Sequence, residues 1–221
     1  MKWLLLYFFL QVVVPKQHAI PEVPAGVLPQ ADTTLGVLIL VNKEYKLPKG
    51  YRPHDLVPID EAYNKGVMNL LRSEAAAAFA RMCAKAAKDS IILWSRSAYR
   101  SDTVQRQLYE NAVERRGEEG AEKYTARPGY SEHQTGLTVD INSTHLSFGN
   151  TPEGIWLKKH AHLFGYIERY PIGKESVTGY AYEPWHYRYV GTEAAAYIVE
   201  NKLTFEEYHE RKREPAGNPA R

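Results

Sequence analysis

A histidine and an aspartate lie seven positions apart within residues 125–141, in a segment that cannot form one straight strand. In such a strand His133 and Asp140 would lie roughly 23 Å apart and on opposite faces, so the chain has to turn before their side chains can meet. Gly136 supplies the turn. Apolar and polar residues then alternate over residues 137–141, which predicts a strand with its apolar side chains against a core and Asp140 on the other face.

A second pair of polar residues follows in residues 180–190, where aromatic and polar residues alternate as they do in a strand. Glu183 and His186 would point to opposite faces of a regular strand. Pro184 lies between them and restricts the residue before it, so we expect an irregular strand at this point. This irregularity allows both side chains to face one cavity.

These side chains are the parts of a catalytic metal site. Two imidazoles and one carboxylate, from His133, His186 and Asp140, can bind a divalent ion and leave a fourth position for water. A second carboxylate that does not bind the ion, Glu183, can take the proton of that water. Nitrogen and oxygen ligands with an open position favour zinc. We therefore predict one zinc ion per chain, with Glu183 as the general base.

Three segments of the chain resemble the signatures of a known peptidase family. They are Ser-Ala-Tyr-Arg-Ser at residues 97–101, Ser-Glu-His-Gln-Thr-Gly-Leu-Thr-Val-Asp at residues 131–140, and Tyr-Glu-Pro-Trp-His at residues 182–186. Their order and spacing resemble those of the VanY-type zinc D-alanyl-D-alanine carboxypeptidases, which share a fold and a metal site with VanX-type dipeptidases. The similarity covers roughly residues 37–202.

The resemblance implies a fold, an activity and a substrate. The fold is of the α+β class, with a small antiparallel sheet that carries the zinc site and is packed with helices, as in hedgehog-type domains. The activity is removal of the C-terminal D-alanine from peptidoglycan stem peptides. Ala98 and Tyr130 depart from the pattern, because the family often has glycine and histidine there. These departures leave the ligands intact but bear on the shape of the cleft.

Arg100 is the first candidate for a residue that binds the substrate. A guanidinium group at the end of a strand can bind a terminal carboxylate, or stabilise the negative charge that forms on an attacked carbonyl oxygen. A surface salt bridge is the alternative from spacing alone. The resemblance favours contact with the substrate, and it implies that Gln105 and Ser131 line the same cleft. Gln105 also has the spacing of a residue at a helix start.

The same motifs leave other functions open. The zinc site could cleave an L,D bond in a tetrapeptide or act as a cell-wall endopeptidase, because the shape of the pocket decides between these substrates. The domain could also bind zinc and peptide without hydrolysis. Glu183 argues against this last alternative, because a protein that only binds has no use for an unligated carboxylate facing the open metal position.

The two ends of the chain differ from its centre in composition. Lys2 precedes an apolar run at residues 3–14, which is shorter than the about 20 residues that span a bilayer but fits a secretory signal peptide. We expect a signal peptide or N-terminal anchor (1–19), a linker (20–35), the zinc carboxypeptidase domain (36–205) and a charged, disordered tail (206–221). The protein would then be exported to the cell-wall side of the membrane, either secreted or attached through its N-terminus.

Composition sets further limits. The chain has 221 residues, of which 44% are hydrophobic, and this is enough for one domain with a substantial core. A formal net charge of +2 argues against nucleic acid as a partner, and we expect a monomer. Cys83 is the only cysteine, so an intramolecular disulfide and a thiolate zinc site are excluded. Because it lies in an apolar stripe with helical spacing, we assign Cys83 to the core.

Periodicity predicts the regular elements. Strands are expected at residues 37–42, 91–94, 166–170 and 180–190. Helices are expected from about residue 61 to residue 86, at residues 102–116 and 151–165, and from residue 192. Five further histidines are assigned structural or surface roles; they are His54, His145, His160, His162 and His209.

Overall fold

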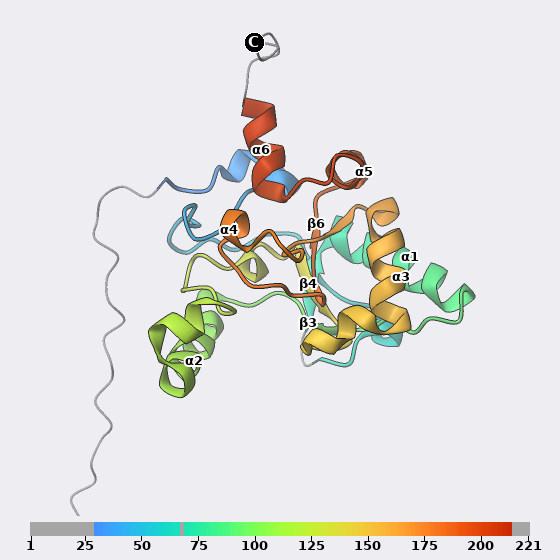
Figure 1. Cartoon of the computed structure of the whole chain (residues 1–221), viewed down its shortest axis with the longest axis horizontal. Coiled ribbons are helices and arrows are strands. Elements are labelled where there is room, and N and C mark those ends of the chain that lie inside the picture. The colour runs from blue at the N-terminus through green and yellow to red at the C-terminus, as the bar shows by residue number, and fades with distance from the viewer. Residues whose placement is uncertain (1–28, 67–68, 214–221) are drawn as a thin grey trace, which may run out of the picture.

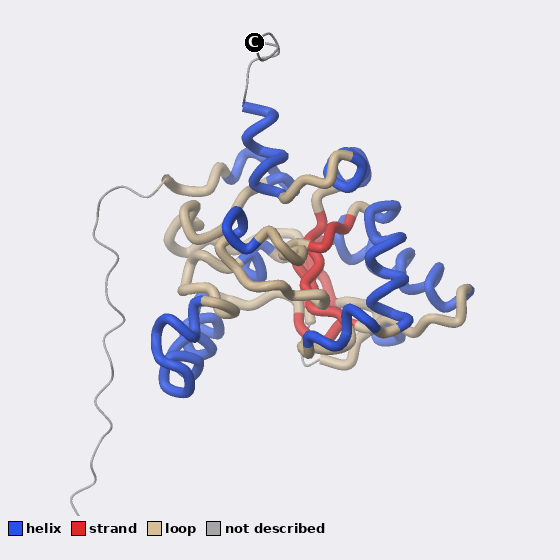
Figure 2. Tube along the Cα trace, viewed as in Figure 1, coloured by secondary structure: helices blue, strands red, loops and turns tan. Residues whose placement is uncertain are grey.

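The computed structural model describes residues 29–66 and 69–213, which form helices around a small antiparallel sheet (Figure 1, Figure 2). Across this sheet the strands are β3 (Ser95–Ser97), β4 (Thr138–Ile141), β6 (His186–Tyr189) and β5 (Tyr166–Glu168). Each neighbouring pair is antiparallel. A smaller sheet pairs β1 (Leu56–Pro58) with β2 (Leu70–Arg72). The predicted α+β fold with a small antiparallel sheet is confirmed.

Helices cover the four-stranded sheet from two sides. The α-helices are α1 (Ser73–Lys88), α2 (Asp102–Glu122), α3 (Pro152–His160), α4 (Glu175–Thr178), α5 (Thr192–Glu200) and α6 (Phe205–Arg213). Short 3₁₀ helices are η1 (Thr33–Leu38), η2 (Glu61–Tyr63), η3 (Glu132–Thr135), η4 (Leu146–Asn150) and η5 (Ala161–Phe164). In Figure 1, α1 and α3 lie on one side of the sheet, and α2 and α4 lie on the other. Within the described residues, no helix has the length and apolar character needed to cross a membrane.

The apolar face of α1 lies at the centre of the core. Its buried side chains recur at three- and four-residue spacing and pack in one cluster with Val139 and Ile141 of β4. Cys83 is 1% exposed, so its predicted place in the core is confirmed. The buried residues of α1 are Ala75, Ala78, Phe79, Met82, Cys83 and Ala86.

The helix predicted from about residue 61 begins later, at Ser73. Residues 61–63 form the 3₁₀ turn η2, and Leu71 belongs to β2, where it pairs with Val57. Leu71 is fully buried in the same cluster as Ala75. The buried residue of the strand therefore has the same spacing from Ala75 as a residue one helical turn earlier would have. For this reason the sequence pattern does not show where the strand ends and the helix begins.

The strand predicted at residues 37–42 is wrong. Val37 lies in η1, and the residues after Leu38 continue as a loop. The carbonyl oxygens of Val37 and Ile39 accept hydrogen bonds from Nη2 of Arg188 at 2.9 and 2.7 Å. A side chain that is distant in the sequence thus takes the place of a neighbouring strand.

The strand predicted at residues 91–94 is displaced, because β3 begins only at Ser95. The side chain of Asn142 accepts a hydrogen bond from the N–H of Trp94 at 2.9 Å and donates to the carbonyl of Ile92 at 2.8 Å. These two bonds replace strand pairing just before β3.

The predicted helices at residues 102–116 and 151–165 are present. Thr151 caps α3 by accepting a hydrogen bond from the N–H of Gly154 at 3.2 Å. Gly165, with a φ of 82°, ends the short η5 that follows α3. In α2 the helix continues beyond residue 116 across a kink at Gly117, whose φ is 71°.

The prediction of a disordered tail from residue 206 is wrong for the residues that form α6. Phe205 and Tyr208 are buried in a second core cluster that includes Val190 of the segment after β6. Glu206 forms an ion pair with Arg169. The high charge of this segment led to the prediction of disorder, but Phe205, Tyr208 and the buried carboxylate of Glu206 hold the helix against the domain.

The predicted linker also ends earlier than expected. Ala31 is 4% exposed, and its N–H donates a hydrogen bond to the carbonyl of Lys46 at 2.8 Å. Ala31 therefore belongs to the packed domain. The signal peptide or anchor predicted at residues 1–19 lies outside the described residues, as does the tail from residue 214.

Candidate metal centre

His133 lies in η3, immediately before the turn into β4. Its Nδ1 donates a hydrogen bond to the carbonyl of Ala98 at 2.6 Å, which leaves the lone pair of Nε2 facing Asp140. Gly136 has a φ of 68° and ends η3, as predicted for the turn. A Cβ at this position would lie 2.6 Å from Cδ2 of Leu56. Both backbone conformation and packing therefore require glycine between the two polar residues.

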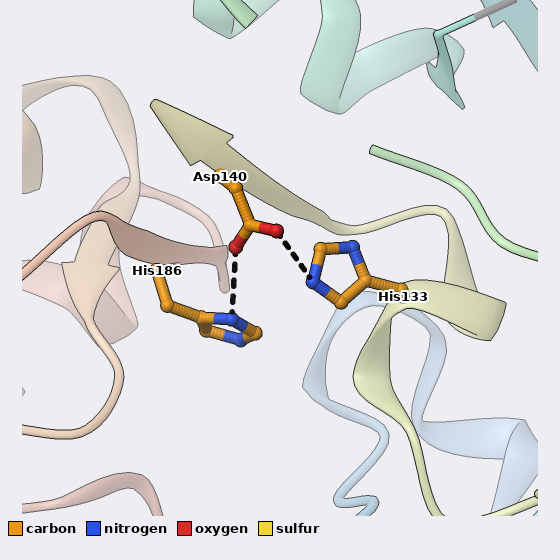
Figure 3. Close-up of side chains that lie close together, drawn as sticks. All are labelled: His133, Asp140 and His186. Carbon is orange, nitrogen blue, oxygen red and sulfur yellow. Dashed lines mark ion pairs between the residues drawn. The ribbon is translucent and has the colours of Figure 1, made fainter. Parts of the chain in front are cut away.

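Asp140 and His186 are register partners in β4 and β6 and lie next to each other on the sheet. Oδ1 of Asp140 is 3.2 Å from Nδ1 of His186, and Oδ2 is 3.4 Å from Nε2 of His133 (Figure 3). The imidazole rings are 5.0 Å apart between centroids and cross at 84°. One ligand atom from each residue lies within 4.8 Å of the others, so the three predicted ligands form a group that one ion can bridge.

The chemistry of this group fits zinc. Two imidazole nitrogens and one carboxylate are a common protein ligand set for a catalytic zinc ion. Nε2 of His133 and Oδ1 of Asp140 are buried and have no hydrogen-bond partner among the described residues. Burial, together with the charge of Arg100, lowers the pKa of His133 to about 4, so that its imidazole is neutral and able to bind a metal.

Glu183 lies beside the grouped ligands. Its Oε2 is 3.6 Å from Nδ1 of His186, and its side chain is largely buried. The N–H of His186 donates to the carbonyl of Glu183 at 3.1 Å, so the chain forms a turn around Pro184 before β6 begins. This turn places the side chains of Glu183 and His186 at one cavity, as we expected from the position of Pro184 between them. Burial raises the pKa of Glu183 to about 8.

Arg100 reaches the same site from the loop between β3 and α2. Its Nη2 is 3.4 Å from Oδ2 of Asp140, and its Nη1 donates to Oε1 of Gln105 at 3.1 Å. Gln105 in turn donates through Nε2 to the carbonyl of Ala126 at 2.7 Å. Nε of Arg100 is buried and has no hydrogen-bond partner in the described part of the chain. Arg100 is thus held in place with one donor that a bound group can use.

These residues line one cleft of about 740 Å³. A second wall comes from α2, through Leu108, Ala112, Arg115 and Arg116. In Figure 1, α2 stands apart from the sheet that carries the ligands. The sequence pattern indicated the helix but not that this face borders the site. All predicted site residues are on the wall of the cleft; they are Arg100, Gln105, Ser131, His133, Asp140, Glu183 and His186.

The sequence pattern did not indicate a role for Glu132, although it lies inside the motif that supplies His133. Oε2 of Glu132 is 3.6 Å from Nε2 of His186, the ring nitrogen that does not face Asp140. An available signal was Arg188, a charged residue inside a predicted buried strand, because a buried guanidinium needs a carboxylate partner. Arg188 is fully buried, and it does bind Glu132.

Comparison with known protein families shows which family the chain belongs to. The family model described as "VanY: D-alanyl-D-alanine carboxypeptidase" matches residues 68–192. The chain belongs to the VanY family. Among curated proteins, it is 44% identical over 184 residues to the "Putative carboxypeptidase YodJ" of Bacillus subtilis (strain 168), covering 79% of this chain and 67% of that protein. It is 35% identical to a "D-alanyl-D-alanine carboxypeptidase" of Enterococcus faecium, covering 78% of this chain and 57% of that protein.

Solved structures agree with membership of the VanY family. The LdcB LD-carboxypeptidase is 42% identical with a TM-score of 0.74, and the match covers 80% of this chain and 86% of that one. VanYB in complex with D-alanine-D-alanine is 33% identical with a TM-score of 0.71, covering 80% and 99%. A glutamate-to-alanine mutant of the D,D-pentapeptidase VanY from the VanB-type resistance cassette, in complex with Zn(II), is 33% identical with a TM-score of 0.69, covering 78% and 98%.

The site and the comparisons agree on zinc. The His133, Asp140 and His186 group fits the ion, and a VanY structure contains it. The chain is therefore a zinc-dependent peptidase of the VanY family, and the predicted cofactor and enzyme class are confirmed.

Proposed function

We propose that the protein is a carboxypeptidase that removes the C-terminal D-alanine from peptidoglycan stem peptides. The observation that carries this proposal is the meeting of three metal ligands, Glu183 and Arg100 in one cleft of a VanY family member. A neighbouring structure of the family contains D-alanine-D-alanine, which supports a dipeptide terminus of this kind as the substrate group.

The side chains of the cleft have different roles in hydrolysis. When bound, zinc supplies a Lewis acid that polarises water and the scissile carbonyl. Glu183, beside the metal ligands, accepts the proton of the attacking water and passes it to the leaving amine. Arg100, with Nε unpaired among the described residues, donates to the oxygen on which negative charge develops.

The remaining polar groups hold the reacting parts in position. Gln105 fixes the guanidinium of Arg100 through its side-chain oxygen. Ser131 is 4% exposed and lies on the wall of the cleft, next to the segment that carries His133. We assign to Ser131 a contact with the bound peptide.

An L,D-carboxypeptidase is the second candidate. One observation favours it: the LdcB LD-carboxypeptidase structure is 42% identical to this chain, and the VanYB structure is 33% identical. The ligands and Glu183 serve either reaction, because the configuration of the penultimate residue is read by the walls of the cleft and not by the groups that attack the carbonyl.

Mass spectrometry of peptide products decides between these functions. The purified protein is incubated with stem pentapeptide, with stem tetrapeptide and with cross-linked stem peptides, in each case with added zinc and with a chelator. We expect loss of one alanine from the pentapeptide and no loss after chelation. Trimming of the tetrapeptide alone would establish the L,D activity. Cleavage of cross-linked peptides alone would identify an endopeptidase, and zinc binding without any cleavage would contradict an enzymatic role.

We further propose that the protein acts as an exported monomer on the cell-wall side of the membrane. The apolar run at residues 3–14 supports export, and the proposed substrate lies outside the membrane. All of the residues assigned to the site come from one chain, so the proposed activity needs no second subunit. N-terminal sequencing of protein from the producing cells, with size-exclusion chromatography, tests both points; recovery only from the cytosol with an intact N-terminus would contradict export.

A further inference from the structure

A network of buried charges lies behind the metal ligands. Oε1 of Glu132 accepts hydrogen bonds from Nε of Arg169 at 2.9 Å and from Nη1 of Arg188 at 2.8 Å. The side chains of all three residues are fully buried. Two guanidinium groups thus fix the position and the charge of one carboxylate.

The free oxygen of this carboxylate faces a metal ligand. Oε2 of Glu132 is 3.6 Å from Nε2 of His186, and both atoms are buried without a hydrogen-bond partner among the described residues. The other ring nitrogen, Nδ1, faces Asp140 in the site. The imidazole of His186 therefore lies between two carboxylates, one in the metal site and one behind it. A histidine that binds a metal usually donates its other ring N–H to a group placed in this way.

The network continues to the C-terminal helix. Arg169 donates through Nη1 and Nη2 to the two oxygens of Glu206 in α6, at 2.8 and 2.5 Å. Nδ2 of Asn42 donates to Oε1 of Glu206 at 3.1 Å. Glu206 lies beyond residues 68–192, the part of the chain that matches the family model.

Stability of the fold does not by itself account for these groups. Taking charged side chains out of water costs free energy that their mutual attraction often only offsets, and apolar residues of similar volume frequently serve as well. What the charges supply that apolar residues cannot is a carboxylate of fixed position at Nε2 of His186.

We infer that Glu132 is a positioning residue for the metal ligand His186, and that Arg169 and Glu206 extend this support to α6. With its negative charge 3.6 Å from Nε2, Glu132 favours the tautomer of His186 that carries the proton on Nε2, so that the lone pair of Nδ1 is directed at the metal position, and it restrains rotation of the ring. The two-point pair between Arg169 and Glu206 holds the guanidinium that orients Glu132. This inference rests on the zinc site of the proposed function, but its test needs no substrate.

The test is the zinc affinity of four variants, measured by competition with a chromophoric chelator on purified metal-free protein. Glu132→Gln removes the negative charge beside Nε2 of His186, and we expect zinc binding to weaken about 10- to 100-fold. Glu206→Gln releases Arg169 at a distance from the ion, and we expect a smaller loss in the same direction. The matched control is Glu207→Gln, the next residue of α6, which pairs with Lys174 near the surface at 2.7 Å and should leave zinc affinity unchanged.

Thermal unfolding separates positioning from general destabilisation. Phe79→Leu, in the core on α1 and outside the network, should lower the midpoint of unfolding while the folded protein keeps its zinc affinity. Wild-type zinc affinity in folded Glu132→Gln would overturn the inference. If Glu132→Gln does not fold, Glu206→Gln decides: zinc affinity equal to that of Glu207→Gln would overturn the role of the network. Tight zinc binding by a wild-type protein that cleaves no stem peptide would contradict only the proposed function.

Discussion

Arg100 donates a hydrogen bond from Nη1 to Oε1 of Gln105 at 3.1 Å. Because the amide of Gln105 is itself anchored on the carbonyl of Ala126, the guanidinium is fixed from the side of α2. Gln105 was expected to line the cleft, and it does. Its contacts show in addition that it orients the residue proposed to stabilise charge on the substrate.

Replacement of Gln105 by alanine should therefore lower activity without loss of zinc. A hydrogen bond to a charged group contributes about 1.5–3 kcal/mol, so we expect kcat/KM to fall roughly 10- to 100-fold. Gln107→Ala is the control, because Gln107 is exposed on the same helix and bonds to Asn111. Equal values of kcat/KM for the two variants would show that Gln105 does not contribute to catalysis by orienting Arg100.

Glu183→Gln should keep zinc bound and lose turnover. The substitution retains the size of the side chain beside His186 but removes its ability to take a proton, and general base catalysis contributes about 10²- to 10⁴-fold. Peptide hydrolysis is followed together with zinc content by elemental analysis. Near-normal rates would show that another group accepts the proton, and loss of zinc would make Glu183 a ligand.

Gly136→Ala should destabilise the protein more than Gly173→Ala. Both glycines have a positive φ, 68° and 78°, which costs roughly 1–2 kcal/mol for a residue with a Cβ. Only at Gly136 would the new Cβ also lie 2.6 Å from Cδ2 of Leu56, whereas nothing lies within 4 Å at Gly173. Chemical denaturation compares the free energies of unfolding. Equal losses would mean that the chain relaxes around the turn between His133 and Asp140.

His209 should make stability depend on pH. Burial, followed by the charges of Arg188 and Arg213, lowers its pKa from 6.5 to about 4. Between these values the unfolded chain binds the proton and the folded protein does not, so the free energy of unfolding falls as pH drops from about 6.5 to 4. His209→Gln should flatten this part of the profile, and His54→Gln, at an exposed position, should not. Parallel profiles for both variants would assign the pH dependence to other groups.

The metal ligands and the two strands next to them, β4 and β6, could be predicted because their signals are local. Gly136 and Pro184 mark the two places where a regular strand would have separated the polar side chains, and both turns occur there. Of the supporting charges, Arg188 gave a local signal through its place in a predicted strand, whereas Arg169 and Glu206 gave none. Whether Arg169 and Glu206 are buried depends on partners that are 37 residues apart in sequence, and no periodicity encodes that pairing. For the same reason the sequence predicts a disordered tail where α6 carries Glu206.

The two walls of the cleft are built in different ways. The ligand side rests on strands and buried charges, which leave little room for new side chains. On α2 the buried residues are Gln105, Tyr109 and Ala121, while Leu108, on the cleft, is 40% exposed. Such a helix tolerates new side chains at little cost to folding. We therefore expect substrate preference to diverge, by natural variation or in a laboratory library, through the exposed cleft positions of α2, while the groups assigned to hydrolysis are inherited unchanged.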